Sequence, residues 1–78
     1  MNVNQRILKV IGQFYKSDLS KIRLDTPIEQ LNLDSLDFLA LHMDIEKEFE
    51  VEISIDKFVD STNINDLVNI VTECLTEK

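Results

Sequence analysis

The sequence has very few of the residues on which small catalytic and metal-binding sites depend. Its 78 residues include one cysteine, one histidine, one glycine, one proline and no tryptophan. A lone cysteine, Cys74, cannot form an intramolecular disulfide or a pair of zinc ligands, which excludes a disulfide scaffold and a zinc finger. The only glycine, Gly12, lies within a predicted helix, so a glycine-rich phosphate-binding loop is excluded as well.

Long apolar runs are also absent. No stretch approaches the roughly 20 apolar residues needed to cross a bilayer. The segment Met1–Arg6 lacks the basic start and apolar run of a signal peptide. A chain this short buries about 60% of the surface that its unfolded form exposes, which is enough for one core. We therefore expect a single cytoplasmic domain, residues 1–78, without a membrane span.

Acidic residues outnumber basic ones, and they are concentrated in the second half of the chain. The formal net charge is −7, from 15 acidic and 8 basic side chains. Residues 1–33 contain five basic and three acidic side chains, whereas residues 34–78 contain three and twelve. Such a field repels nucleic acid and attracts proteins that present Lys and Arg patches, although acidity can also serve only to keep a small domain soluble. We expect basic protein partners and no nucleic acid.

The hydrophobic pattern predicts an all-α fold. Apolar residues recur at helical spacing over residues 3–16, from Asp34 or Ser35 onward, and in a last helix capped by Asn63. After residues 51–53 the chain is predicted to form a connector, in which residues 55–59 are long enough for one or two short turns, and no alternating run predicts a paired strand. We expect a small four-helix bundle of three longer helices and one short one. Residues 17–34 are expected to form a long loop, pinned to the core by its apolar side chains.

The second predicted helix has two apolar faces. The first, expected to face the core, consists of Phe38, Leu41, Ile45 and Phe49. The second consists of Leu36, Leu39 and Met43, bordered by acidic residues. Because one helix in a small domain cannot bury both faces, part of the second set is expected to stay accessible as a docking surface.

No catalytic or metal-binding constellation is present. Ser35 and His42 are seven residues apart, about 10 Å along a helix axis, which is too far for a hydrogen bond between a serine and its base. We expect His42 to be a boundary residue and Cys74 a small core residue. The acidic residues do not follow the EF-hand pattern, which requires a central glycine. The chain is therefore predicted not to be an enzyme, with no catalytic residue and no metal.

Ser35 is the remaining candidate for a functional residue. A serine at a helix start is most often a cap, but Asp34 is available here for that role. Ser35 is then free to point outward, where a phosphate ester on its hydroxyl would lie at the positive end of the helix dipole. The residue has the features of an attachment point rather than of an attacking group.

The string LNLDSLD at residues 31–37, followed by a helix with Glu-x-x-Phe at residues 46–49 and then Glu52-Ile53, resembles the acyl carrier protein family. The resemblance extends over almost the whole chain. It implies that Ser35 carries a 4′-phosphopantetheine arm, transferred from coenzyme A by a magnesium-dependent phosphopantetheinyl transferase. The arm's thiol would hold acyl groups as thioesters and present them to enzymes of fatty acid, polyketide or related biosynthesis.

The same resemblance implies which residues contact partner enzymes. The residues that would contact basic patches on partner enzymes are Asp34, Leu36, Asp37, Leu39, Met43 and Glu46. A bound acyl chain would lie between the helices, among Leu41, Ile45 and Ile70. The carrier is expected to act as a monomer.

Three positions depart from the family pattern. Asn32 stands where the family usually has Gly, and Asn tolerates a left-handed backbone better than most residues. Ala40 and Lys47 stand where many fatty-acid carriers have Glu, which lowers the charge of the docking face and points to a specialised pathway. A different reading of the residues is a small acidic helical adaptor, in which Ser35 is only a cap and no prosthetic group is attached.

Overall fold

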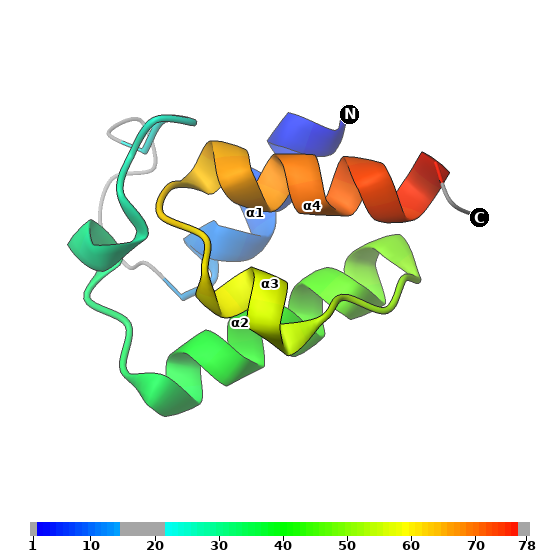
Figure 1. The fold of residues 1–78 in the computed structure, drawn as a ribbon. Helices are drawn as coiled ribbons and strands as arrows, with labels where there is room; N and C mark the ends of the chain where they lie inside the picture. The colour runs from blue at the N-terminus through cyan, green and yellow to red at the C-terminus, as the bar shows by residue number, and fades with distance from the viewer. Residues whose placement is uncertain (1, 15–21, 77–78) are drawn as a thin grey trace.

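The computed structural model describes residues 2–14 and 22–76. In these residues four α-helices and one short 3₁₀ helix surround a single apolar core (Figure 1). The elements, in order, are α1 (Val3–Gly12), the 3₁₀ helix η2 (Ile28–Leu31), α2 (Ser35–Phe49), α3 (Ile55–Val59) and α4 (Ile64–Thr76). The predicted bundle of three longer helices and one short helix is thus confirmed. None of the described helices has the length and hydropathy that a bilayer span requires.

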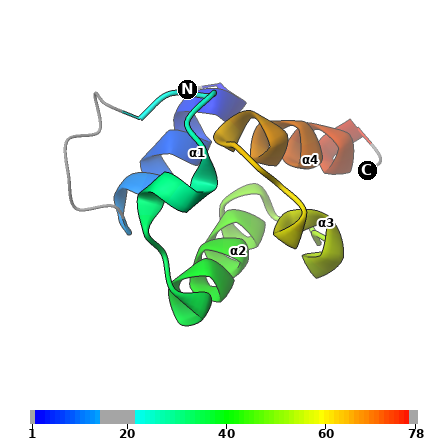
Figure 2. The ribbon, with the colours of Figure 1, turned by 60° about the vertical axis from the view of Figure 1, so that its left-hand side comes forward.

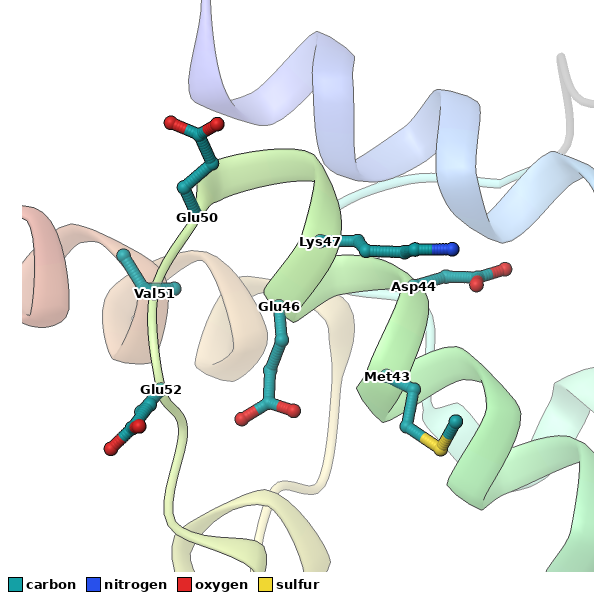
Figure 3. Close-up of a pocket in the computed structure, with 7 residues that line it drawn as sticks. All are labelled: Met43, Asp44, Glu46, Lys47, Glu50, Val51 and Glu52. Carbon is teal, nitrogen blue, oxygen red and sulfur yellow. The ribbon is translucent and has the colours of Figure 1, made fainter.

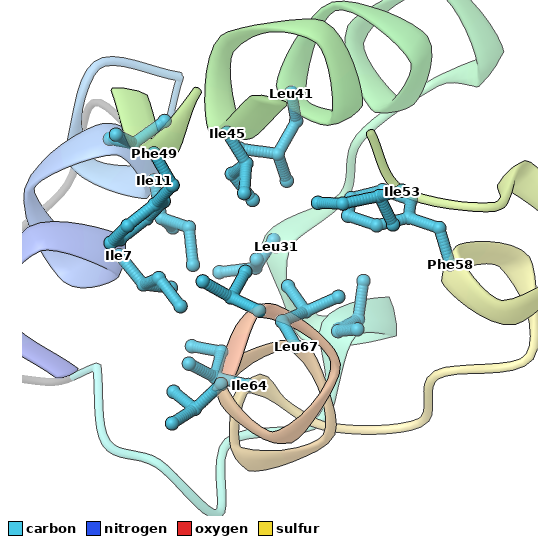
Figure 4. Packing of buried hydrophobic residues seen from close by; sticks show 14 of the residues in the cluster. Ile7, Ile11, Leu31, Leu41, Ile45, Phe49, Ile53, Phe58, Ile64 and Leu67 are labelled. Atoms are coloured by element: carbon cyan, nitrogen blue, oxygen red, sulfur yellow. The ribbon is translucent and has the colours of Figure 1, made fainter. Parts of the chain in front are cut away.

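The core is built from the predicted helical stripes. From α2, Leu41 and Ile45 are fully buried and point toward the α4 residues Ile64 and Leu67 (Figure 4). Of the other two residues predicted for the core face of α2, Phe49 is buried and Phe38 is partly buried. On α4 the buried side chains are Ile64, Leu67, Val68 and Val71, whereas Cys74 and Leu75 are partly buried because they lie near the end of the helix, at the edge of the core.

Helix α1 is shorter than predicted. It ends at Gly12, and the N–H groups of Gln13 and Phe14 donate to the carbonyls of Val10 and Ile11 at 3.1 and 3.0 Å. These bonds span three residues and close the last turn tightly, as is common at a helix end. Residues 15 and 16 of the predicted helix lie outside the described part of the chain.

Arg6 of α1 secures the C-terminal end of α2. Its guanidinium lies 4.4 Å from the centre of the Phe49 ring, and Nε donates to Glu48 Oε2 at 2.9 Å. A second guanidinium nitrogen donates to the backbone carbonyl of Glu48 at 2.7 Å. That carbonyl is one of the last four of the helix, which have no partner inside it. One side chain therefore binds α1 to α2 by a cation–π contact, an ion pair and a carbonyl cap.

The loop before α2 is held against the start of α4. Pro27 and Asn63 form an isolated antiparallel bridge, in which Ile28 N–H donates to Thr62 O at 2.9 Å and Ile64 N–H to Thr26 O at 3.2 Å. The predicted apolar anchors of the loop are buried (Ile22, Ile28 and Leu31) or partly buried (Leu24 and Leu33). The 3₁₀ helix η2 was not predicted, and it tightens the loop just before α2 (Figure 2).

Asn63 caps α4, as predicted, and the Asp66 carboxylate accepts hydrogen bonds from Thr62 and, at 3.4 Å, from the backbone N–H of Asn63. Asp66 N–H donates to Asn63 Oδ1 at 3.0 Å. Asp66 Oδ2 accepts from the backbone N–H of Thr62 at 2.9 Å and from its hydroxyl at 2.8 Å. The bonds from the Thr62 N–H and hydroxyl, joined by a weaker one from Asn63, lower the pKa of Asp66 below its ordinary value of 3.8.

This lowered pKa predicts a contribution to stability that acid removes. Above the unfolded-state pKa the ionised Asp66 stabilises the folded chain, and the contribution is lost as the pH falls through the lower, folded-state pKa. We expect wild type to be more stable than Asp66→Asn at pH 7, with a difference that shrinks by pH 3. Urea unfolding of both proteins at the two pH values measures it. A difference that is the same at both would show that the carboxylate charge plays no part.

Candidate functional site

Ser35 is the first residue of α2, and it is exposed. Its side chain makes no hydrogen bond within the described residues. Figures 1 and 2 show this end of α2 as the corner of the molecule that the η2 loop leads into. The hydroxyl is therefore open to a large partner and is not used in holding the helix.

Asp34, and not Ser35, caps the helix. Its backbone is extended, with φ −78° and ψ 178°, and its Oδ1 accepts from the N–H of Asp37 at 2.8 Å. Its carbonyl accepts the N–H of Phe38 at 2.9 Å, the first bond of the helical ladder. The predicted division of roles between the two residues is confirmed in this respect: the aspartate carries the cap and leaves the serine hydroxyl unused.

The backbone around Ser35 suits a phosphate ester. The N–H groups of Ser35 and Leu36 have no acceptor in the described part of the chain. Unpartnered N–H groups at a helix start, together with the helix dipole, favour an anion. The residues present thus fit a phosphodiester on Ser35 Oγ, although Asp34 and Asp37 place two carboxylates nearby.

Asn32 sets the direction in which the chain enters α2. It has φ 53° and ψ 39°, in the left-handed region, and its N–H donates to Glu29 O at 3.2 Å to close η2. The sequence-based expectation that Asn can replace a glycine here is consistent with this geometry, because Asn pays a smaller steric cost there than most residues. Buried Leu31 and half-buried Leu33 on either side fasten the turn to the core.

Leu36, Leu39 and Met43 are 77%, 46% and 61% exposed, respectively. They lie at spacings of three and four along α2, with exposed Asp34 and Asp37 at its start. Because large apolar side chains rarely gather in the open without a reason, this face has the form of a docking surface: an apolar strip with acidic residues at its edge. The structure therefore places five of the six candidate docking residues on the exposed side of α2 and its cap, from Asp34 to Met43.

Glu46, the sixth candidate, is engaged inside the molecule. Its Oε2 accepts the backbone N–H of Ile53 at 2.8 Å, and its Oε1 is 3.7 Å from His42 Nδ1. The carbonyl of Ile53 is 2.8 Å from His42 Nε2, and because a carbonyl only accepts, Nε2 carries the proton in this bond. Together His42 and Glu46 fasten the connector after α2 to the helix. His42 is thus a boundary residue, as predicted, with a structural role.

Two hollows adjoin α2. An open one of about 570 Å³ lies at its C-terminal end and is lined by Met43, Asp44, Glu46, Lys47, Glu50, Val51 and Glu52 (Figure 3). A groove of about 440 Å³ lies nearer Ser35 and is lined by Pro27, Ile28, Glu29, Phe38, Val59, Ser61 and Thr62. Within the described residues, no group of three His, Cys, Asp or Glu side chains is placed to hold a metal ion.

Sequence reasoning did not single out α3 as part of the site. Its Ile55 and Val59 are 39% and 58% exposed, and Val59 lines the groove next to Phe38 of α2. Their spacing of four residues was a usable signal for one face of a short helix. Phe58 between them is buried against Phe38 and His42.

Comparison with known proteins gives one consistent result. The family model described as "Phosphopantetheine attachment site" matches residues 5–71. An acyl carrier protein of Rickettsia bellii (strain RML369-C) is 32% identical over 73 residues, 92% of this chain and 85% of the relative. One from Onion yellows phytoplasma is 38% identical over 72 residues, 91% of this chain and 95% of the relative. The crystal structure of an acyl carrier protein from Thermotoga maritima superimposes with a TM-score of 0.78 at 25% identity, covering 94% of this chain and 86% of the other.

The fold and the matched domain define a phosphopantetheine attachment domain. The chain belongs to the acyl carrier protein family. It is a carrier of acyl intermediates and not a catalyst, and its partners are enzymes that handle acyl groups.

The division of roles at the start of α2 predicts two different effects of alanine. Asp34→Ala removes the cap and should lower the free energy of unfolding by about 1 kcal/mol. Ser35→Ala removes an exposed hydroxyl that holds nothing, so its effect should stay within about 0.5 kcal/mol. Urea unfolding of both variants beside wild type measures this. A Ser35→Ala variant as destabilised as Asp34→Ala would show that the serine shares the cap.

Proposed function

We propose that Ser35 is the residue that bears the 4′-phosphopantetheine arm. The observation that carries the proposal is its exposed hydroxyl, which stands free at the start of α2 while Asp34 holds the helix. Ser35 lies within the residues that match the attachment-site family. The unpartnered N–H groups of Ser35 and Leu36 favour the charge of the ester once it has formed.

On this proposal the chain supplies an oxygen and a platform. Ser35 Oγ forms a bond to the phosphorus of coenzyme A, the pyrophosphate bond breaks, 3′,5′-ADP leaves, and the hydroxyl proton passes to a base on the transferase. The arm supplies a thiol, which holds acyl groups as thioesters. Cys74 takes no part, since its thiol is half-buried and lies 3.5 Å from the carbonyl of Glu52.

In this proposal, partner enzymes bind the exposed face of α2. Leu36, Leu39 and Met43 give it an apolar centre, and Asp34 and Asp37 give it charge beside Ser35. Negative charge of this kind speeds the encounter with a basic patch on a partner, and a small apolar centre allows specific but reversible binding. Glu46 contributes its charge to the field while its oxygens hold Ile53 and face His42.

The remaining parts of the proposal concern the setting. The partners include a phosphopantetheinyl transferase and acyl-loading and acyl-transferring enzymes with Lys and Arg patches. The chain acts in the cytoplasm as a monomer, with residues 1–78 forming one carrier domain. All buried side chains of the described residues join one core, which is consistent with a single unit.

Attachment is tested by intact mass. Incubation with coenzyme A, magnesium and a broad-specificity transferase should raise the mass of wild type by one phosphopantetheinyl group, and the mass of Ser35→Ala should not change. Ser61→Ala is a matched control that should gain the group normally. A gain that persists in Ser35→Ala would place the arm elsewhere, and no gain in wild type would favour the adaptor interpretation.

Docking is tested by charge reversal and salt. Asp37→Lys should slow modification of Ser35 by at least about threefold at low ionic strength and by much less at roughly 1 M salt, where exposed charges are screened. Glu73→Lys makes the same change of charge at an exposed position of α4, outside the proposed docking residues, and should have little effect. Equal slowing by both variants would mean that only total charge matters.

A further inference from the structure

Three aromatic side chains pack against one another between α2 and α3. The Phe38 and Phe58 rings have centroids 4.8 Å apart, and the His42 ring meets Phe58 edge-on at 5.0 Å. Phe58 is 1% exposed, and the His42 side chain is 12% exposed. We call Phe38, His42 and Phe58 the aromatic cluster.

The aromatic cluster lies on the row of α2 that begins at Ser35. Phe38 and His42 are three and seven residues after Ser35, and both spacings return to the same face of a helix. Phe38 and then His42 follow Ser35 along the side of α2 that packs against α3, whereas Leu39 lies on the exposed face. Both contact Phe58 of α3.

The aromatic cluster is fixed in place. His42 Nε2 donates to the carbonyl of Ile53 at 2.8 Å, which ties the ring to the connector between α2 and α3. Behind the cluster, Leu41 and Ile45 have no exposed surface. The groove of about 440 Å³ near this end of α2 is lined by Phe38 and Val59 but not by His42 or Phe58, so it lies outside the cluster.

We propose that the aromatic cluster keeps the acyl cargo out of the helical bundle, so that this carrier takes short or polar acyl groups and holds them at its surface. This rests on the proposed attachment at Ser35. A long alkyl chain could enter only if Phe58 left its buried position and His42 released Ile53. A short or polar acyl group loses little by staying in water, because the gain from burial grows with apolar area. The family resemblance implies a cargo position among Leu41, Ile45 and Ile70. In this proposal the acyl group stays at the protein surface instead.

The test compares two cargoes on the same arm. The transferase, supplied with acetyl- or octanoyl-coenzyme A, forms the Ser35 Oγ–phosphorus bond with loss of 3′,5′-ADP and leaves the thioester intact. Neutral hydroxylamine then cleaves the thioester, releasing the hydroxamate and the free thiol, and intact mass follows the rate. In wild type we expect the two thioesters to be cleaved within about twofold of each other, since neither is shielded.

Variants locate the effect in the aromatic cluster. Phe58→Ala should open a space in which the octanoyl group is cleaved at least about fivefold more slowly than the acetyl group. Phe58→Leu offers a milder change should the alanine variant unfold. Val59→Ala, at the exposed neighbouring position of α3, is the matched control and should behave as wild type.

The outcomes separate this inference from the proposed function. Failure of wild type to gain mass would reject attachment, whereas slow cleavage of the octanoyl group in wild type would overturn the exclusion of cargo alone. A second measurement needs no arm: saturating benzene, a probe that enters dry apolar cavities, should raise the melting temperature of Phe58→Ala but not of wild type. An equal rise in both would show that the aromatic cluster does not fill the space.

Discussion

The hydrogen bond from the Asp37 N–H to the Asp34 carboxylate is the interaction on which the site depends. The first N–H groups of a helix need acceptors from outside it, and a serine at that point is normally drawn into the task. Because the Asp34 carboxylate is that acceptor, Ser35 takes helical geometry and its side-chain oxygen makes no hydrogen bond within the described residues. The Ser35 hydroxyl is therefore accessible for the attachment of a group, while the helix keeps its cap.

The surrounding structure keeps this helix start in one place. Asn32 in the left-handed region turns the chain into α2, and the bridge between Pro27 and Asn63 holds the preceding loop against α4. At the other end of α2, Arg6 binds both the side chain and the carbonyl of Glu48. Both ends of the helix are therefore fixed by contacts between segments far apart in the sequence, and its outward face is left open.

The features that could be predicted from the sequence are those set by residues a few positions apart. The Asp34 cap, the two stripes of α2 and the tolerance of Asn32 for its backbone angles follow from spacing and residue type within a few positions. The 3₁₀ helix η2 spans only four residues and so has no periodicity to detect. The contact of Arg6 with Glu48 joins residues 42 positions apart. The hydrogen bond from the Ile53 N–H to Glu46 depends on the path of the connector after α2, which the sequence does not specify. Phe58 lay in a segment read as a connector, so its contact with Phe38 and His42 was not foreseen.

Securing α2 at both ends also affects recognition. An enzyme that docks on α2 as proposed meets a helix held at both ends, so little conformational entropy is lost when the two associate. A recognition surface that needs no rearrangement also associates faster than one that must first change shape. The contacts of Arg6 and Asp34, at opposite ends of α2, thus keep the helix ready for rapid encounter.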